Sequence, residues 1–205
     1  MAGEKEIRLA GAILGGGHHV CAFFNDEDEK YSVLTPFIRE GLAQGHRVIQ
    51  VVAIEDRERQ LARTRREGTD VATAIDDGRI EVRSWRESVP PPVDADTSVQ
   101  VVRRILEEGR ARGFPLTRLI GDMAWALEAL HGMREVLRYE AQLDEVLADY
   151  RDPVVCCYDT SRFPGSAIID AIRTHPVVII GGVLHENPFH VAPAEFLRQL
   201  GSQSN

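Results

Sequence analysis

Thiol and imidazole groups occur together in two apolar runs of this sequence, and such groups can bind a transition metal or react with an oxidant. His19 and Cys21 alternate onto one face of a predicted strand. Cys156 and Cys157 point to opposite faces of another. Four metal ligands at a usual spacing are not visible, and buried free cysteines most often pack as small apolar residues. We therefore expect core packing and assign no metal ligands, with thiol sensing and metal binding as open alternatives.

Acidic and amide side chains follow four predicted strands at the point where each strand ends. In an open parallel sheet, ligands bind at the carboxyl ends of the strands, so these side chains are expected to meet at one binding edge. The set is Asn25, Asp26, Glu55, Asp56, Asp122 and Asp159. One use for it is to bind a small ligand. The alternative is a metal-assisted hydrolase or a degenerate NTPase that uses Glu55, Asp56 and Asp122, but we assign no catalytic residue.

The turn after the first strand lacks the chemistry of a phosphate loop. Such a loop needs glycines, whose backbone N–H groups face the anion, and a lysine. Residues 25–29 read "NDEDE" instead. Their four carboxylates would repel a triphosphate, so we expect no specific binding of ATP or GTP. Asn25 or Asp26 is suited to cap the helix that follows.

Glu140 interrupts an apolar helical stripe. The stripe consists of Met133, Val136, Leu137, Leu143 and Leu147. Helical periodicity places Glu140 on the same face, where a carboxylate needs either a partner or a raised pKa. A structural pair with a nearby arginine and a role in a ligand pocket are the two alternatives.

Aromatic, imidazole and amide side chains near the predicted binding edge complete the candidates. Trp125, a few residues past the end of a strand, either walls a cavity or packs under a loop. His175 and His185 are predicted to be loop residues with satisfied rings, although His185 lies near the edge. Asn187 and Pro188 together predict a turn.

The composition is that of one globular α/β domain. The 205 residues are 43% hydrophobic and carry a formal charge of -8, which argues against direct nucleic-acid binding. The arginine-rich stretch 57–66 also contains acids, so we expect a solvated helix face. No apolar run reaches the ~20 residues that span a bilayer, and no secretory signal is visible. We expect a cytoplasmic protein without a membrane partner, and three cysteines agree with a reducing compartment.

Six short runs rich in β-branched residues alternate with helical patterns. The runs are residues 20–24, 48–53, 80–85, 116–120, 154–158 and 177–180. Their spacing predicts parallel strands joined by right-handed crossovers, and hence a doubly wound, mostly parallel sheet with helices on both faces. Residues 15–200 are expected to form a single domain, with an N-terminal arm over residues 1–14 and a flexible tail over residues 201–205.

Several segments resemble known domains. "TPFIREGLAQGHRVIQVVAIED" is similar to the first helix and second strand of RecA-like ATPases of the KaiC type, and "RLIGDMAW" stands where that class has its Walker B strand. More specifically, "HHVCAFFNDEDEKY", "GDMAWAL", "RYE", "CCYD", "THP" and "ENPF", in this order, resemble the MEDS domain, the methanogen/methylotroph, DcmR-type sensory domain. The resemblance covers about residues 15–200.

The resemblance implies a RecA-like fold without its phosphate loop and a sensor that binds a small organic ligand, for example a hydrocarbon derivative, at the carboxyl edge of the sheet. It also implies a signalling or transcription-regulatory protein partner, leaves a homo-oligomer open and names no cofactor. A ligand-free interaction module is the remaining alternative. The expected ligand-binding residues are His19, Cys21, Asn25, Asp26, Asp122, Trp125, Tyr139, Glu140, Tyr158, Asp159, His185 and Asn187. Tyr139 and Glu140 stand in "RYE", which favours the pocket role for Glu140.

Overall fold

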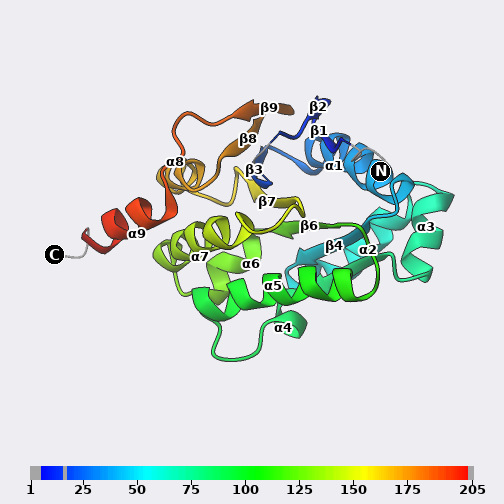
Figure 1. Ribbon diagram of the computed structural model, residues 1–205, viewed down its shortest axis with the longest axis horizontal. Coiled ribbons are helices and arrows are strands. Elements are labelled where there is room, and N and C mark those ends of the chain that lie inside the picture. Colours follow the sequence, from blue (N-terminus) through cyan, green and yellow to red (C-terminus); the bar gives the residue numbers. More distant parts are fainter. Residues whose placement is uncertain (1–5, 16–17, 203–205) are drawn as a thin grey trace.

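A seven-stranded, mostly parallel sheet forms the centre of the molecule (Figure 1). The computed structural model describes residues 6–15 and 18–202. In spatial order the strands are β5 (Ile80–Ser84), β4 (Arg47–Val52), β6 (Thr117–Asp122), β7 (Val154–Asp159), β3 (His19–Phe24), β8 (Val177–Ile180) and β9 (Val183–Glu186). Neighbouring strands are parallel except for β8 and β9. The first strand of the sheet along the chain, β3, therefore lies between two of the last.

All six predicted strands are present, close to their predicted bounds. Apart from exposed Ile180 and half-buried Val51, their apolar, β-branched side chains are buried on both faces of the sheet, as expected for parallel strands. The antiparallel strand β9 was not predicted. Gly181 and Gly182 adopt φ values of 58° and 72°, which suit the tight turn that joins β8 to β9.

Helices cover both faces of the sheet, so the predicted doubly wound fold is confirmed (Figure 1). One face packs against α1 (Glu27–Ala43), α2 (Arg57–Arg65) and α3 (Thr69–Asp76). The other packs against α4 (Trp85–Ser88), α5 (Ala95–Ala111), α6 (Ala124–Ala129), α7 (Met133–Leu147) and α8 (Gly165–Arg173). The last helix, α9 (Pro193–Ser202), packs on α7.

Strand β3 distributes its side chains between two hydrophobic cores. Val20, Ala22 and Phe24 join the core beneath α1, whereas Cys21 and Phe23 join the core beneath α5 and α7. Each core is continuous over several strands because neighbouring parallel strands keep the same alternation. This alternation decides which polar side chains can meet in the interior.

Helix α1 begins immediately after β3, where a phosphate loop would otherwise stand. Asp26 is its N-cap and accepts a hydrogen bond from the backbone N–H of Glu29 at 2.8 Å. Glu27, Asp28 and Glu29 occupy the first turn, where carboxylates interact favourably with the helix dipole. The capping role predicted for Asp26 is confirmed.

The described N-terminal residues pack on the domain. Strands β1 (Arg8–Leu9) and β2 (Ala12–Ile13) form a small hairpin, and Ile7, Leu9 and Leu14 are buried in the core beneath α1. The arm predicted over residues 1–14 is therefore part of the packed structure from residue 6 onward, because three apolar side chains anchor it. At the other end, α9 continues to Ser202, into the predicted tail over residues 201–205.

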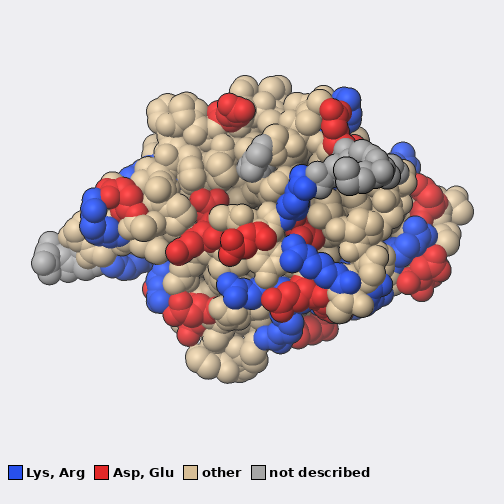
Figure 2. Space-filling model, in the orientation of Figure 1, with Lys and Arg blue, Asp and Glu red and all other residues tan. Residues whose placement is uncertain are grey.

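The viewed surface carries acidic and basic side chains side by side (Figure 2). Along α2, Arg57 contacts Glu58, and Arg59 contacts Asp56 of the 3-10 turn η1 (Ile54–Asp56). This pairing is what a solvated mixed-charge helix face requires. Among the described helices, none combines the length and the apolar character needed to cross a bilayer.

Candidate functional site

Four side chains that can bind a proton or a metal ion meet in the interior, on the face of the sheet that α7 covers. They are His19 of β3, Glu140 of α7, Cys156 of β7 and His175 of the turn before β8, called here the interior cluster. None is more than 1% exposed. Cys21 lies opposite Cys156 in the parallel pair β3–β7, so His19 and Cys156 project from the same face.

Glu140 lies at the centre of the interior cluster. Its Oε2 atom is 3.3 Å from His19 Nε2, 3.5 Å from His175 Nε2 and 3.4 Å from Cys156 Sγ. The Tyr158 hydroxyl donates a hydrogen bond to Glu140 Oε1 at 2.5 Å. The predicted burial of Glu140 is therefore present, but its partners are two histidines and a tyrosine rather than an arginine.

A second layer of hydrogen bonds orients the two histidines. His19 Nδ1 is 3.2 Å from Asp144 Oδ1, and Asp144 Oδ2 is 2.8 Å from His190 Nε2. His175 Nδ1 is 2.8 Å from the carbonyl oxygen of Ala171. Both Nδ1 atoms thus face acceptors, which leaves both Nε2 atoms directed at Glu140.

The electrostatics of the cluster favour a protonated His19 beside a carboxylate. Burial alone would lower the pKa of His19, but the hydrogen bonds and negative charges of Asp144 and Glu140 raise it to about 9. Burial would raise the pKa of Glu140, yet His175 and His19 hold it below its usual value. Burial and the charge of His19 lower the pKa of His175, against the opposing effect of Glu140. Burial raises the pKa of Cys156 well above its usual value.

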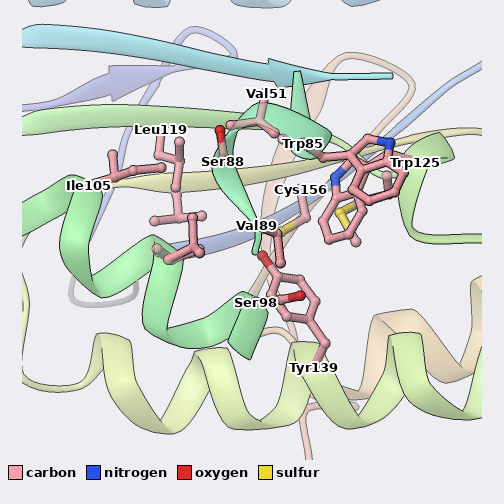
Figure 3. A pocket seen from close by; sticks show the side chains of 15 residues that line it. Val51, Trp85, Ser88, Val89, Ser98, Ile105, Leu119, Trp125, Tyr139 and Cys156 are labelled. Atoms are coloured by element: carbon pink, nitrogen blue, oxygen red, sulfur yellow. The ribbon is translucent and has the colours of Figure 1, made fainter. Parts of the chain in front are cut away.

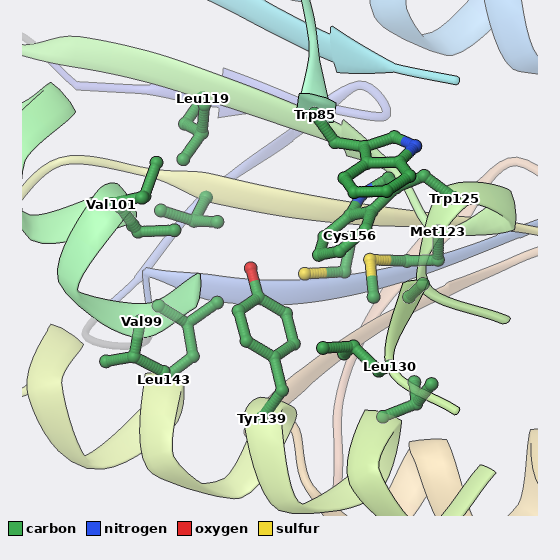
Figure 4. Close-up of a cluster of buried hydrophobic side chains, with 14 of the residues drawn as sticks. Trp85, Val99, Val101, Leu119, Met123, Trp125, Leu130, Tyr139, Leu143 and Cys156 are labelled. Atoms are coloured by element: carbon green, nitrogen blue, oxygen red, sulfur yellow. The ribbon is translucent and has the colours of Figure 1, made fainter. Parts of the chain in front are cut away.

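An apolar cavity adjoins the interior cluster, between the sheet and helices α4, α5 and α7 (Figure 3). The centre of a water-sized molecule can occupy about 30 Å³ of this cavity. An occupant is therefore limited to a few non-hydrogen atoms. Trp85 and Trp125 stack at its wall with ring centroids 5.9 Å apart, and Tyr139 meets Trp125 edge to face (Figure 4). Cys156 belongs to both sites, because it lines the cavity and contacts Glu140.

Neutral polar groups border the cavity. Ser98 Oγ and Trp85 Nε1 are buried without a hydrogen-bond partner among the described residues. The Tyr139 hydroxyl points from α7 into the cavity (Figure 4). Burial raises the pKa of Tyr139 well above its usual value, so the hydroxyl stays neutral. Within the described part of the chain, no charged side chain lines the cavity, which suits an uncharged molecule.

The carboxyl ends of the strands form a separate, charged site. A pocket there is lined by Asp26, Asp56, Asp122 and Asp159, so the predicted convergence of these acids is found. Cations already pair with two of them. Lys30 donates to Asp122 Oδ2 at 2.6 Å, and Arg59 donates to Asp56 Oδ1 at 2.7 Å.

The arrangement at this edge gives little support to the hydrolase alternative. Glu55 does not line the pocket, and the second carboxylate oxygen of Asp122 accepts the backbone N–H of Ala124 at 3.1 Å. In residues 6–15 and 18–202, the only grouping of three or more potential metal ligands is the interior cluster.

We expect neither Mg-ATP nor Mg-GTP to bind at the carboxyl edge. Lys30, the cation nearest to the position of a phosphate-loop lysine, is held by Asp122, whose charge raises the pKa of Lys30 against the opposing effect of burial. The surrounding carboxylates repel a triphosphate. Titration calorimetry should show no saturable heat up to about 1 mM nucleotide, and a micromolar Kd would contradict this prediction.

The remaining predicted residues are not brought together with either interior site, except Cys21, which is buried in the same core opposite Cys156. Asn25 bonds with Glu29 and Thr160 at the turn after β3. His185 is exposed on the edge strand β9, outside both interior sites. Asn187 Nδ2 donates to the carbonyl of His175 at 2.7 Å and so holds that loop.

Residue patterns alone missed three members of the site. His175 was expected to be a loop residue with a satisfied ring, but it is fully buried and its Nε2 atom has no hydrogen-bond partner among the described residues. Asp144 and His190 are not among the residues predicted for the site. Asp144 follows Glu140 by one helical turn, and that i, i+4 spacing was the available signal.

Comparisons of the sequence identify related proteins. The model of the family described as MEDS, methanogen/methylotroph, DcmR sensory domain, matches residues 18–176. The transcriptional repressor DcmR of Methylorubrum extorquens is 26% identical over 173 residues, which are 83% of this chain and 62% of the repressor. The chain thus spans less than two thirds of that relative.

Solved structures share the fold. A KaiC-like protein of Pyrococcus horikoshii superposes with a TM-score of 0.55 at 16% identity, covering 80% of this chain and 69% of its own. An uncharacterized protein of the same archaeon, solved in complex with an unknown peptide, has a TM-score of 0.58 at 16% identity, covering 82% and 78%. These likenesses confirm the KaiC-like, RecA-type fold.

Proposed function

Because the chain belongs to the methanogen/methylotroph, DcmR sensory domain family, we propose that it senses a small, largely apolar organic molecule and relays its presence to a regulator of transcription. The observation that carries this proposal is the cavity beneath α4, α5 and α7. It combines aromatic and aliphatic walls with the hydroxyls of Ser98 and Tyr139, which can orient an acceptor atom of the ligand.

The proposed binding site differs from the expected one at the carboxyl edge. That edge presents paired charges, and a neutral molecule would have to compete there with water and with strong ion pairs. The cavity presents uncharged walls. Val51, Ser88 and Gly121 are the partly buried members of its lining and mark its approach to the surface.

Helix α7 is the element through which an occupied cavity could act on a partner. Tyr139 contacts the cavity, and the next residue, Glu140, centres the interior cluster. On another side of the same helix, Leu137 and Ala141 pack against Phe196 of α9, the last described helix. A shift of α7 on ligand binding would therefore reach the surface. The similarity to a transcriptional repressor supports a regulatory output.

Tryptophan fluorescence tests this proposal directly. The sequence contains two tryptophans, Trp85 and Trp125, and both line the cavity, so their emission reports on its contents. We expect a saturable change in emission with at least one member of a panel of uncharged two- to four-carbon alcohols, ketones and esters. Acetate and propylammonium are expected to give none, because the cavity offers no counter-charge.

Two leucine substitutions on α5 separate cavity binding from nonspecific effects. Ser98→Leu adds bulk inside the cavity without breaking a hydrogen bond, and it should abolish the response. Gln100→Leu adds the same side chain on the exposed side of the helix and should leave the response unchanged. Equal responses in both variants, or equal responses to charged compounds, would refute binding in the cavity.

A further inference from the structure

We propose that the interior cluster, His19, Glu140, Cys156 and His175, binds one divalent transition metal ion of the zinc class in tetrahedral coordination. The residues come from β3, α7, β7 and the turn before β8, so the ion would join four separate elements of the fold. This inference is independent of the proposed organic ligand, because it concerns side chains outside the cavity except for Cys156.

Four of the six distances between ligand atoms match a tetrahedral site. Zinc bonds of about 2.0–2.1 Å to nitrogen, 2.0–2.2 Å to oxygen and 2.3 Å to sulfur imply separations of about 3.3–3.6 Å between ligand atoms. Glu140 Oε2 is 3.3 Å from His19 Nε2, 3.4 Å from Cys156 Sγ and 3.5 Å from His175 Nε2. Cys156 Sγ is 3.6 Å from His19 Nε2. All four atoms lie within 4.8 Å of one another.

The hydrogen bonds around the histidines point the correct atoms at the centre. His19 faces Asp144, and His175 faces the Ala171 carbonyl, each through Nδ1. Metal-bound histidines almost always donate their other ring N–H to a carboxylate or a carbonyl in this way. Their Nε2 atoms are then free to offer lone pairs to an ion.

His175 supplies an independent sign that something belongs at the centre. Its Nε2 atom is fully buried, has no hydrogen-bond partner among the described residues and faces a carboxylate oxygen at 3.5 Å. With Nδ1 carrying the proton, two acceptors face each other, which is unfavourable without a cation between them. The Tyr158 hydroxyl occupies Glu140 Oε1 and leaves Oε2 as a single ligand atom.

The donor set selects the class of ion. Two imidazole nitrogens, one thiolate and one carboxylate oxygen suit zinc, and cobalt as its spectroscopic substitute. Calcium and magnesium need six or more oxygen ligands, which the cluster does not supply. Binding would displace the thiol proton of Cys156 and the second ring proton of His19 to solvent. The thiolate and the Glu140 carboxylate would then balance the double charge of the ion inside the core.

Cobalt titration of the chelator-treated full chain tests the proposal. We expect one Co²⁺ per chain, with visible absorption typical of tetrahedral cobalt and a thiolate-to-cobalt band in the near ultraviolet. Zinc should displace the cobalt and bleach both. Wild-type protein that binds no stoichiometric Co²⁺ would overturn the proposal without any variant, so the test does not depend on whether a substituted cluster folds.

Two matched cysteine variants locate the ion. Cys156→Ser should abolish the thiolate band and weaken Co²⁺ binding by about 100-fold or more. Removing a metal ligand lowers the affinity more than removing a residue that only orients a ligand. Cys157→Ser, also buried but on the opposite face of β7, should bind like wild type. Retention of the band in Cys156→Ser would exclude this site.

Two further variants test whether Asp144 orients His19 and whether the cavity and the ion site are independent. Asp144 orients His19 rather than binding the ion. Asp144→Asn should therefore keep the thiolate-to-cobalt band but weaken Co²⁺ binding by about 10- to 100-fold. A wholly structural Asp144 would change stability and leave Co²⁺ affinity as it is, which would contradict its orienting role. Ser98→Leu should bind Co²⁺ as wild type does. Failure of the organic ligand assay and failure of the metal assay are therefore distinguishable.

Discussion

Glu140→Gln is expected to lower the free energy of unfolding of metal-free protein by about 3–5 kcal/mol at neutral pH. The substitution keeps the shape of the side chain but removes the negative charge that faces protonated His19 at 3.3 Å. Among the described residues, Asp144 is then the only carboxylate partner that His19 retains. Urea unfolding in the presence of a chelator, followed by far-ultraviolet circular dichroism, measures the change.

Glu145→Gln is the matched control on the same helix. Glu145 is exposed, so the same change of charge should alter stability by no more than about 0.5 kcal/mol. Breaking a buried ion pair usually costs several kcal/mol. If the free energy of unfolding of Glu140→Gln lay within about 1 kcal/mol of the wild-type value, Glu140 and His19 would not form such a pair. Stability alone does not separate a structural from a functional Glu140, because the structure makes it central to the fold and to the proposed ion site.

The stability of metal-free protein is expected to fall by about 3 kcal/mol as the pH rises from 6.5 to 9. Asp144 and Glu140 raise the pKa of His19 from 6.5 to about 9, against the effect of burial. The stability from this proton is fully present below pH 6.5, where the unfolded chain also binds it. It is lost as the pH rises through the folded pKa.

Other members of the cluster set the opposite slope. Burial lowers the pKa of His175, so below about pH 6.5 the unfolded chain binds a proton there more readily than the folded chain does. Stability therefore falls as the pH falls through this range. The lowered pKa values of Glu140 and Asp144 contribute stability that is lost at still lower pH. The curve should therefore peak near pH 6.5. Chemical unfolding across pH 5–10 measures this dependence of stability on pH. His19→Gln should flatten its alkaline side. His185→Gln, on exposed β9, is the control and should leave the alkaline side unchanged. A flat alkaline side in wild type would contradict the assignment.

The sequence carried enough information to predict most of the fold. Runs such as residues 48–53 and 177–180 contain consecutive β-branched residues, and burial on both faces of a parallel sheet makes that composition necessary. Strand β9 escaped prediction because it is short, mostly exposed and lies at the sheet edge, where no core demands apolar residues. The hairpin β1–β2 has two residues in each strand, too few for any period.

The sites were predictable only in part. Strand alternation correctly placed His19 and Cys21 on one face, and the helical period correctly buried Glu140. Neither period reaches His175, which lies in a turn and enters the cluster through the docking of α8 and β8. The cavity was even harder to predict from the sequence. It exists because Ser98 and its neighbours on α5 leave space against Trp85 and Trp125, and such a packing defect depends on how the elements fit rather than on composition.

The position of β3 between β7 and β8 has a consequence during synthesis of the chain. His19 pairs with Val154, and Val20 with Val177, so β3 leaves the ribosome long before either neighbour exists. At 5–20 residues per second the delay is on the order of 10 s. Through that interval an apolar strand has no permanent partner, which exposes the nascent chain to aggregation and makes early protection by chaperones valuable. The same delay means that no chain ending before His175 can assemble the interior cluster.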